Sequence, residues 1–332
     1  MDVSSQIIIT IAGGLACATK DGQTNSSITE ISDSIRKQFS SIDIQIIDYA
    51  DIDSSLADLD FFYDLARTIQ RKMNSHQVKG MILVYGTDTM EILAYFLHRC
   101  IINHNKPIVI TGSTRETKNF DFDGRANLCN SIKQILNKDS IFYSNGVSIN
   151  FAGKIHNPSY FRKEHTFSID PFTSGKSGII GMMHGENIDW RGVLKRPVLI
   201  PLPNKLESIP IVCAYPGAPD FLLDVFLNRN FKAVVIIAYG SGNVSEELFY
   251  SIKKAIEFGI KVILVTKCQF GGVSPEYAGV GGNQSLIDLG VVMASDLNAY
   301  QAMVVASLVI GNSMSKNGTN LDSYFNNEIT KN

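Results

Sequence analysis

The sequence lacks an excess of charge of either sign, and this excludes several classes of partner. Its 332 residues carry 30 Lys and Arg against 32 Asp and Glu, which gives a formal net charge of −2. Nucleic-acid binding depends on a basic field, which this balance does not supply. Long apolar runs are missing too, and none approaches the ~20 residues that span a bilayer. We therefore expect no nucleic-acid partner and no membrane partner.

Signatures of disulfides, metals and dinucleotides are also absent. The five cysteines are scattered and form no CxxC pair, which favours reduced thiols in a cytoplasmic protein. The apolar run at 7–11 has no Lys or Arg before it, so it is a poor signal peptide. Six histidines include no HxxxH pair, and the early glycines lack G-x-G-x-x-G spacing. We expect neither a metal nor a cofactor.

Short apolar strands alternate with helical patterns along the chain. In the first part we expect strands over 6–12, 42–49, 80–86, 107–111 and 146–151, and helices over 31–39, 59–73, 90–97 and 123–136. Residues 16–27 are small and polar without periodicity, which predicts a mobile loop. Residues 153–177 read as a longer polar segment. The alternation predicts a mostly parallel sheet with right-handed crossovers.

The same alternation resumes after a stretch rich in proline. Four prolines between 191 and 210 interrupt regular structure and predict a domain boundary. Beyond it we expect strands over 210–215, 232–239 and 260–265, and helices over 219–228, 245–258 and 298–311. The sequence therefore predicts two α/β domains with mostly parallel sheets, residues 1–195 and 210–332.

The turn at 86–89 joins an apolar strand to a helix and is a candidate ligand site. In an open α/β sheet, ligands bind where strand carboxyl ends face helix N-termini. Thr87 and Asp88 are expected in that crevice, with the turns at 13–14, 53–55 and 112–113 on the same edge. The alternative is structural, because Asp88 and Glu91 have the spacing of a helix-capping pair.

Four long motifs occur along the chain: YGTDTMEILAYF (85–96), ITGSTRETKNFDFDGRANL (110–128), YPG (215–217) with YGSGN (239–243), and VTKCQFGGVSPEYAGVGG (265–282). With them the sequence resembles the bacterial-type L-asparaginases, especially their cytoplasmic type I branch, and the asparaginase-like subunit of glutamyl-tRNA amidotransferase. The resemblance implies an asparaginase-like fold, a substrate such as L-asparagine or a related small amide, and active sites between subunits of a homodimer or homotetramer.

The resemblance also implies catalytic residues. Thr87 matches one of the two threonines that the family uses, and Asp88 matches the carboxylate beside it. Lys163 matches the family's lysine, because the flanking pattern K-x-H-x(4)-D-x-F recurs over 163–172. Without the resemblance, Lys163 reads as a solvated charge between Arg162 and Glu164.

Further positions are matched to substrate binding. Ser54 falls on the serine that holds the substrate's α-carboxylate, with Ser55 beside it and Gly86 in the adjoining turn. Asn243 falls on the asparagine that members contribute from the partner subunit. The residues alone leave two alternatives open, because Ser54 suits a helix N-cap and Asn243 an ordinary turn.

The chain departs from the family at the first nucleophile. Where members read T-G-G-T, residues 12–15 read A-G-G-L, so Leu15 replaces the threonine, and no tyrosine occurs in the following lid segment. Leucine cannot act as a nucleophile. Two functions stay open: an amidohydrolase that uses Thr87 and Lys163, or a loop residue such as Thr19, and a catalytically impaired relative that binds an amino acid or regulates a partner. Survival of Thr87, Asp88 and Lys163 favours the enzyme.

Overall fold

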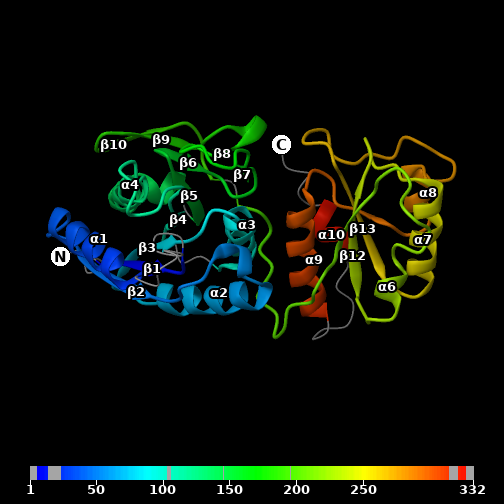
Figure 1. Ribbon diagram of the computed structural model, residues 1–332, viewed down its shortest axis with the longest axis horizontal. Coiled ribbons are helices and arrows are strands. Elements are labelled where there is room, and N and C mark those ends of the chain that lie inside the picture. The colour runs from blue at the N-terminus through cyan, green and yellow to red at the C-terminus, as the bar shows by residue number, and fades with distance from the viewer. Residues whose placement is uncertain are drawn as a thin grey trace. The chain divides into compact units, whose positions relative to one another are not determined.

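A computed structural model describes residues 6–13, 24–102, 106–144, 146–194, 196–313 and 321–326. The chain divides into two compact units, residues 1–199 and 200–332 (Figure 1). Each unit has its own sheet with helices on both faces. The prediction of two α/β domains with mostly parallel sheets is confirmed.

Unit 1 contains, within the described ranges, an eight-stranded sheet in the order β10-β9-β6-β5-β4-β3-β1-β2. Its parallel part consists of β1 (Gln6–Ile11), β2 (Asp43–Asp48), β3 (Val78–Val84), β4 (Ile108–Thr111) and β5 (Val147–Phe151). Three antiparallel strands extend it: β6 (Lys154–His156), β9 (Gly181–His184) and β10 (Asn187–Trp190). A separate two-stranded sheet pairs β7 (Arg162–Lys163) with β8 (Phe172–Thr173).

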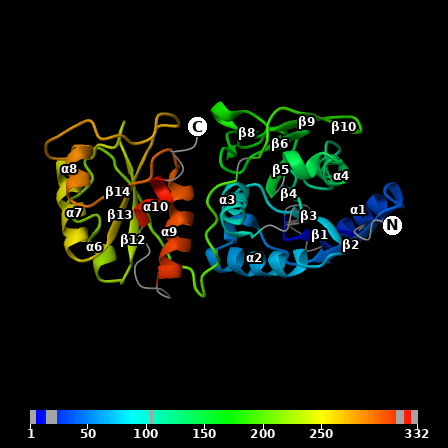
Figure 2. The ribbon, with the colours of Figure 1, turned by 180° about the vertical axis from the view of Figure 1, so that it is seen from behind.

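Helices cover both faces of this sheet. They are α1 (Thr24–Gln38), η1 (Ser54–Leu56), α2 (Leu59–Met73), α3 (Met90–Cys100), α4 (Gly124–Leu136), α5 (Ser140–Tyr143) and η2 (Gly175–Ser177). Figures 1 and 2 show α1 and α4 on one side of the strands and α3 on the other. Strands β1 and β3 are apolar without alternation and almost wholly buried, as expected of parallel strands covered on both faces.

Unit 2 contains, in its described part, a parallel four-stranded sheet in the order β11-β12-β13-β14. The strands are β11 (Ile211–Cys213), β12 (Ala233–Ala238), β13 (Lys261–Thr266) and β14 (Val292–Met293). The helices are α6 (Asp224–Leu227), α7 (Glu246–Glu257), α8 (Asn283–Asp288), α9 (Ala299–Ser313) and α10 (Leu321–Asn326). Figures 1 and 2 place α9 and α10 on one face of this sheet and α6, α7 and α8 on the other. No helix among the described residues has the length and apolarity to cross a membrane.

Several short elements are not expected from the sequence, and three further differences concern segments that it does describe. The loop expected over 16–27 is wrong at its end, because α1 begins at Thr24, ahead of the apolar positions that signalled the helix; residues 16–23 lie outside the described residues. Only α6 forms within the helix expected over 219–228. The backbone N–H groups ahead of α6 donate hydrogen bonds to carbonyls three residues earlier, which closes turns and not an α-helix. The polar segment 153–177 contains β6, β7 and β8, whose two or three residues are too short for periodicity to reveal.

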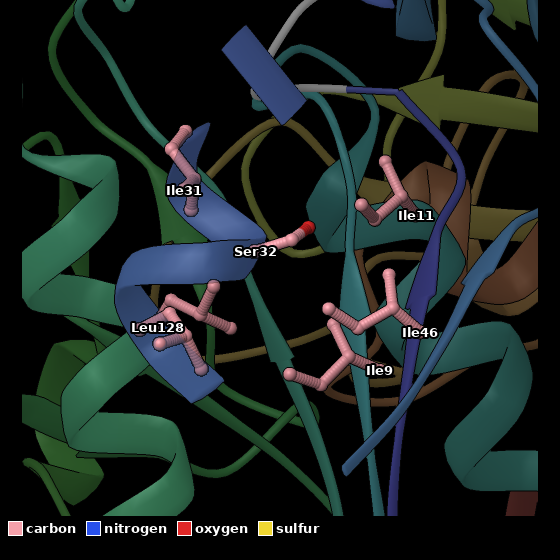
Figure 3. A pocket seen from close by; sticks show the side chains of 7 residues that line it. Ile9, Ile11, Ile31, Ser32, Ile46 and Leu128 are labelled. Atoms are coloured by element: carbon pink, nitrogen blue, oxygen red, sulfur yellow. The ribbon is translucent and has the colours of Figure 1, made fainter. Parts of the chain in front are cut away.

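A small apolar pocket lies between α1 and the sheet of unit 1 (Figure 3). Figure 3 shows the hydroxyl of Ser32 directed into it. The lining residues are Ile9, Ile11, Ile31, Ser32, Ile35, Ile46 and Leu128, most of which belong to the core between α1, α4 and the strands. The pocket is therefore a gap in core packing, and it shares no residue with the turn that carries Thr87.

Candidate active site

The turn at 86–89 lies between the end of β3 and the start of α3, as the strand-turn-helix pattern predicts. The N-cap of α3 is Thr89, which makes no side-chain capping bond. The capping pair considered for Asp88 and Glu91 is therefore wrong. The Asp88 carboxylate accepts a hydrogen bond from Lys163 Nζ, and Glu91 accepts one from the Lys163 backbone N–H.

A second turn, at η1, lies against the first. Asp53 caps it, accepting hydrogen bonds from the Ser55 backbone N–H and hydroxyl, both at 2.9 Å. The helix-cap alternative for Ser54 is therefore wrong, because Asp53 fills that position. The buried Ser54 hydroxyl instead accepts a hydrogen bond of 3.3 Å from the backbone N–H of Asp88. Ser55 is exposed beside it.

Gly86 makes this close approach of the two turns possible. A Cβ atom added at Gly86 would lie 2.5 Å from Ser54 Oγ and 2.7 Å from Ser54 Cβ, so no larger residue fits. Real Cβ atoms do not approach other heavy atoms so closely. Gly86 therefore brings Ser54 into contact with the turn that carries Thr87 and Asp88.

Tyr85 and Thr89 bind the two turns together, and the sequence analysis did not single them out. Thr89 Oγ1 donates a hydrogen bond of 2.8 Å to the Ser54 carbonyl. The Tyr85 hydroxyl lies 2.8 Å from Thr89 Oγ1 and is the donor, because the Thr89 hydrogen is already used. Burial is the main cause that raises the pKa of Tyr85 to about 12, so its donor hydrogen is retained at neutral pH. Their positions, Tyr85 just before the 86–89 turn and Thr89 as its last residue, are the only sequence signal for this role.

Lys163 reaches the same turn from the β7–β8 hairpin, far away in sequence. Its Nζ lies 2.9 Å from Thr87 Oγ1 and 2.6 Å from Asp88 Oδ1. The Lys163 side chain is 20% exposed, whereas that of Asp88 is 60% exposed. The solvated-charge alternative for Lys163 is therefore wrong. A lysine amino group in hydrogen-bond contact with a hydroxyl and a carboxylate has the geometry of a general base, and it can take the proton of that hydroxyl once it has lost its own.

The turn after β4 completes this edge of the sheet. The Asp123 carboxylate accepts hydrogen bonds from the backbone N–H groups of Thr114 and Arg115, each at 3.0 Å. The buried Asn127 side chain donates to the Gly112 carbonyl at 3.0 Å and accepts from the Ala152 N–H at 3.0 Å. These bonds hold the ends of β4 and β5 in one arrangement next to β3.

Asn243 belongs to unit 2, in a turn where Tyr239 and Asn243 form a bridge. Its Oδ1 accepts a hydrogen bond of 3.2 Å from the backbone N–H of Asn283. The Asn283 side chain is buried and also accepts from the N–H groups of Glu276 and Tyr277. The Asn243 turn is therefore held in place by Asn283, the first residue of α8.

The structure thus brings Ser54, Gly86, Thr87, Asp88 and Lys163 together in unit 1 and leaves Asn243 in unit 2. Leu15 and Thr19 lie outside the described residues. Across the described ranges, no group of three or more His, Cys, Asp or Glu side chains is placed to hold a metal ion.

Comparison with known families covers almost the whole chain. The family described as asparaginase, N-terminal, matches residues 6–196, and the glutaminase/asparaginase C-terminal domain matches residues 208–320. These two matches confirm the resemblance drawn from the motifs.

Individual relatives agree with this. A probable L-asparaginase of Deinococcus radiodurans is 30% identical over 253 residues, which are 74% of this chain and 74% of that protein. A glutamyl-tRNA(Gln) amidotransferase subunit of Pyrococcus furiosus is 26% identical over 75% of this chain and 58% of its own length. A crystal structure of a probable cytoplasmic L-asparaginase from Campylobacter jejuni superposes with a TM-score of 0.82 at 25% identity, covering 97% of this chain and 99% of that one. The chain belongs to the asparaginase family.

Proposed function

We propose that the protein is an L-asparaginase-type amidohydrolase that converts L-asparagine, or a related small amide, to the acid and ammonia through Thr87. The observation that carries the proposal is the chain of contacts from Thr87 Oγ1 to Lys163 Nζ (2.9 Å) and from Lys163 Nζ to Asp88 Oδ1 (2.6 Å). A nucleophile, its base and a group that orients the base are the parts that amide hydrolysis needs.

The reaction proceeds in two stages with Lys163 as the base. Neutral Lys163 takes the hydroxyl proton while Thr87 Oγ1 forms a bond to the carboxamide carbon. The carbon–nitrogen bond then breaks, and the leaving nitrogen takes the proton from Lys163 and departs as ammonia. Lys163 then takes a proton from water as the water oxygen attacks the ester carbon on Thr87. The bond from that carbon to Thr87 Oγ1 breaks, Lys163 returns the proton to Oγ1, and the acid is released. Asp88 orients the ammonium that forms in each stage.

Substrate binding uses the turn beside the nucleophile. Ser54 is buried against the N–H of Asp88, and the turn lies just ahead of the N-terminus of α3. Backbone N–H groups and the helix dipole favour an anion at that position. We propose that the substrate's α-carboxylate binds there, with Ser54, Ser55 and Gly86 forming its contact surface.

The assembly and compartment follow the same proposal. The protein forms a homodimer or homotetramer in which Asn243 of one subunit reaches the substrate of another, which fits an Asn243 turn braced by Asn283. It works in the cytoplasm, in line with the cytoplasmic assignment of the Campylobacter jejuni protein and with free thiols at Cys100, Cys129, Cys213 and Cys268.

The test is an ammonia-release assay with asparagine, glutamine and several small amides, run on the wild type and on Thr87→Ala. We expect the wild type to release ammonia from at least one amide and Thr87→Ala to lose the activity by about 10²-fold or more, because the nucleophile is gone. Thr87→Ser retains part of the rate, because it keeps a hydroxyl. Equal rates for wild type and Thr87→Ala would contradict the proposal.

Leu15 favours a second candidate function, an amino-acid-binding or partner-regulating protein, since leucine replaces the first nucleophile. Leu15→Thr separates the two. If Thr87 is the nucleophile, the substitution changes the rate by less than about tenfold, which is the effect of a weak, unactivated hydroxyl. An inactive wild type that gains hydrolysis in Leu15→Thr would be an enzyme impaired by Leu15. Amino-acid binding in calorimetry without ammonia release from either protein would establish the second candidate.

A further inference from the structure

Glu91 lies in the first turn of α3 and reaches across to the hairpin that carries Lys163. Its Oε2 accepts a hydrogen bond of 2.7 Å from the backbone N–H of Lys163. The hairpin itself is slight, because β7 and β8 are two residues each and pair only through Arg162 with Thr173 and Lys163 with Phe172. The hairpin is also closed by the Glu164 and His165 N–H groups, which bond to the Pro171 carbonyl. The bond to Glu91 is a charge-assisted one that ties the hairpin to α3.

Lys163 is consequently held at both ends by one short segment of chain. Its Nζ contacts Thr87 and Asp88, and its backbone N–H contacts Glu91, three residues further along. A lysine side chain has four methylene groups joined by rotatable bonds, and it loses much conformational entropy when its ammonium group is fixed. Fixing the backbone relative to the same turn restricts the positions from which Nζ approaches Thr87 Oγ1.

Charge acts in the same direction as geometry. Among the described residues, the Asp88 carboxylate pairs with Lys163 Nζ and the Glu91 carboxylate accepts a bond from the Lys163 N–H. Arg162 precedes Lys163 on β7, and β8 contributes Phe172 and Thr173. Burial raises the pKa of Glu91, and the hydrogen bond from Lys163 together with the charges of Arg162 and Lys163 opposes this rise. The Glu91 carboxylate is therefore half-buried, and the positive charges of Arg162 and Lys163 act on it.

We propose that Glu91 is a positioning residue that holds Lys163 against Thr87 and adds a second negative charge to the environment of its ammonium. The proposal rests on the proposed function for its effect on rate, but not for the contact itself. A base must lose its proton before it can accept one from Thr87. Glu91 thus limits the positions of the base through the Lys163 backbone N–H, and it adds a negative charge near that base.

Three variants separate these effects. Glu91→Ala removes the acceptor and the charge, Glu91→Gln keeps a carbonyl acceptor and removes the charge, and Glu164→Gln removes an exposed carboxylate next to Lys163 as the matched control. Two readouts are taken on the full-length protein. One is hydrogen exchange at the Lys163 amide, which needs no activity, and the other is kcat and KM across pH.

In the hydrogen-exchange measurement, we expect the Lys163 amide to exchange about tenfold faster or more in Glu91→Ala. In Glu91→Gln and Glu164→Gln its exchange rate should stay as low as in the wild type. In kinetics, Glu91→Ala lowers kcat by about 10²-fold with little change in KM, because the base is misplaced rather than the substrate. Glu91→Gln moves the rising limb of the kcat profile to lower pH, since a negative charge has gone. Glu164→Gln leaves both readouts near the wild type.

Unchanged exchange in Glu91→Ala would overturn the proposal, as would a pH profile that moves equally in Glu91→Gln and Glu164→Gln. A loss of kcat in Glu91→Ala without a pH shift in Glu91→Gln would overturn the electrostatic part. If the wild type hydrolyses no amide but the Lys163 amide still exchanges faster in Glu91→Ala, the proposed function is refuted and the contact is supported. Glu91→Gln keeps the test decisive if Glu91→Ala does not fold.

Discussion

Lys163→Met is expected to reduce ammonia release by about 10²- to 10⁴-fold, the usual contribution of a positioned base. Methionine has nearly the same length and fills the same space, but it takes no proton from Thr87 Oγ1, 2.9 Å from Nζ in the wild type. The measurement is kcat with the best amide found for the wild type. Thr87→Ala and Lys163→Met together should cost little more than either alone, because the two residues act as one unit.

The matched control for this experiment is Lys133→Met. The Lys133 side chain is 17% exposed and pairs with Glu186 at 2.7 Å, so it resembles Lys163 in burial and charge pairing. It lies on α4, and its Nζ bonds to Glu186 and to the Gly185 carbonyl, away from Thr87 and Asp88. Equal losses in Lys163→Met and Lys133→Met would show that the loss comes from removing a half-buried ion pair, and would sink the assignment of Lys163 as base.

Gly86→Ala is expected to weaken substrate binding by about ten- to a hundredfold, which corresponds to about 1–3 kcal/mol for lost polar contacts. The added methyl group would lie 2.5 Å from Ser54 Oγ, so the Ser54 turn must move away from the N–H of Asp88. KM, or the dissociation constant from calorimetry, should rise more than kcat falls, because Ser54 is assigned to binding.

Gly192→Ala is the control for Gly86→Ala. A Cβ atom at Gly192 meets its nearest neighbour, Ile180 Cγ2, at an ordinary 3.9 Å, so the same substitution fits without displacing anything. Gly192→Ala should leave KM unchanged. A normal KM in Gly86→Ala would mean that the Ser54 contact does not serve the substrate.

The sequence predicts the long strands and helices well and the shortest strands poorly, for physical reasons. Strand β3 and helix α2 combine an apolar pattern with clear ends, and α2 has a capping Asp58 that accepts a bond from the Phe61 N–H. Such local signals allow an element to be predicted without knowledge of its tertiary contacts. Strands β7 and β8 carry no such signal, because two residues show no periodicity and their pairing is tertiary.

The candidate site divides along the same line. The 86–89 turn is predictable from its strand and helix, and Lys163 from its family pattern. The roles of Glu91 and Thr89 are not, because each depends on a partner far away in sequence: Glu91 on Lys163, and Thr89 on Ser54. Tyr85 acts through Thr89, so its role is hidden for the same reason. Periodicity describes which face a residue occupies, and it does not describe what arrives opposite that face from another part of the chain.

The two outer strands of the eight-stranded sheet affect whether sheets of two copies can pair edge to edge. Strand β2 exposes Asp43 and Asp48 at its two ends, and β10 exposes Asn187 and Asp189. Carboxylates spaced along an open edge repel a second edge that tries to pair with it. Edge-to-edge growth of this sheet into fibres is thereby opposed.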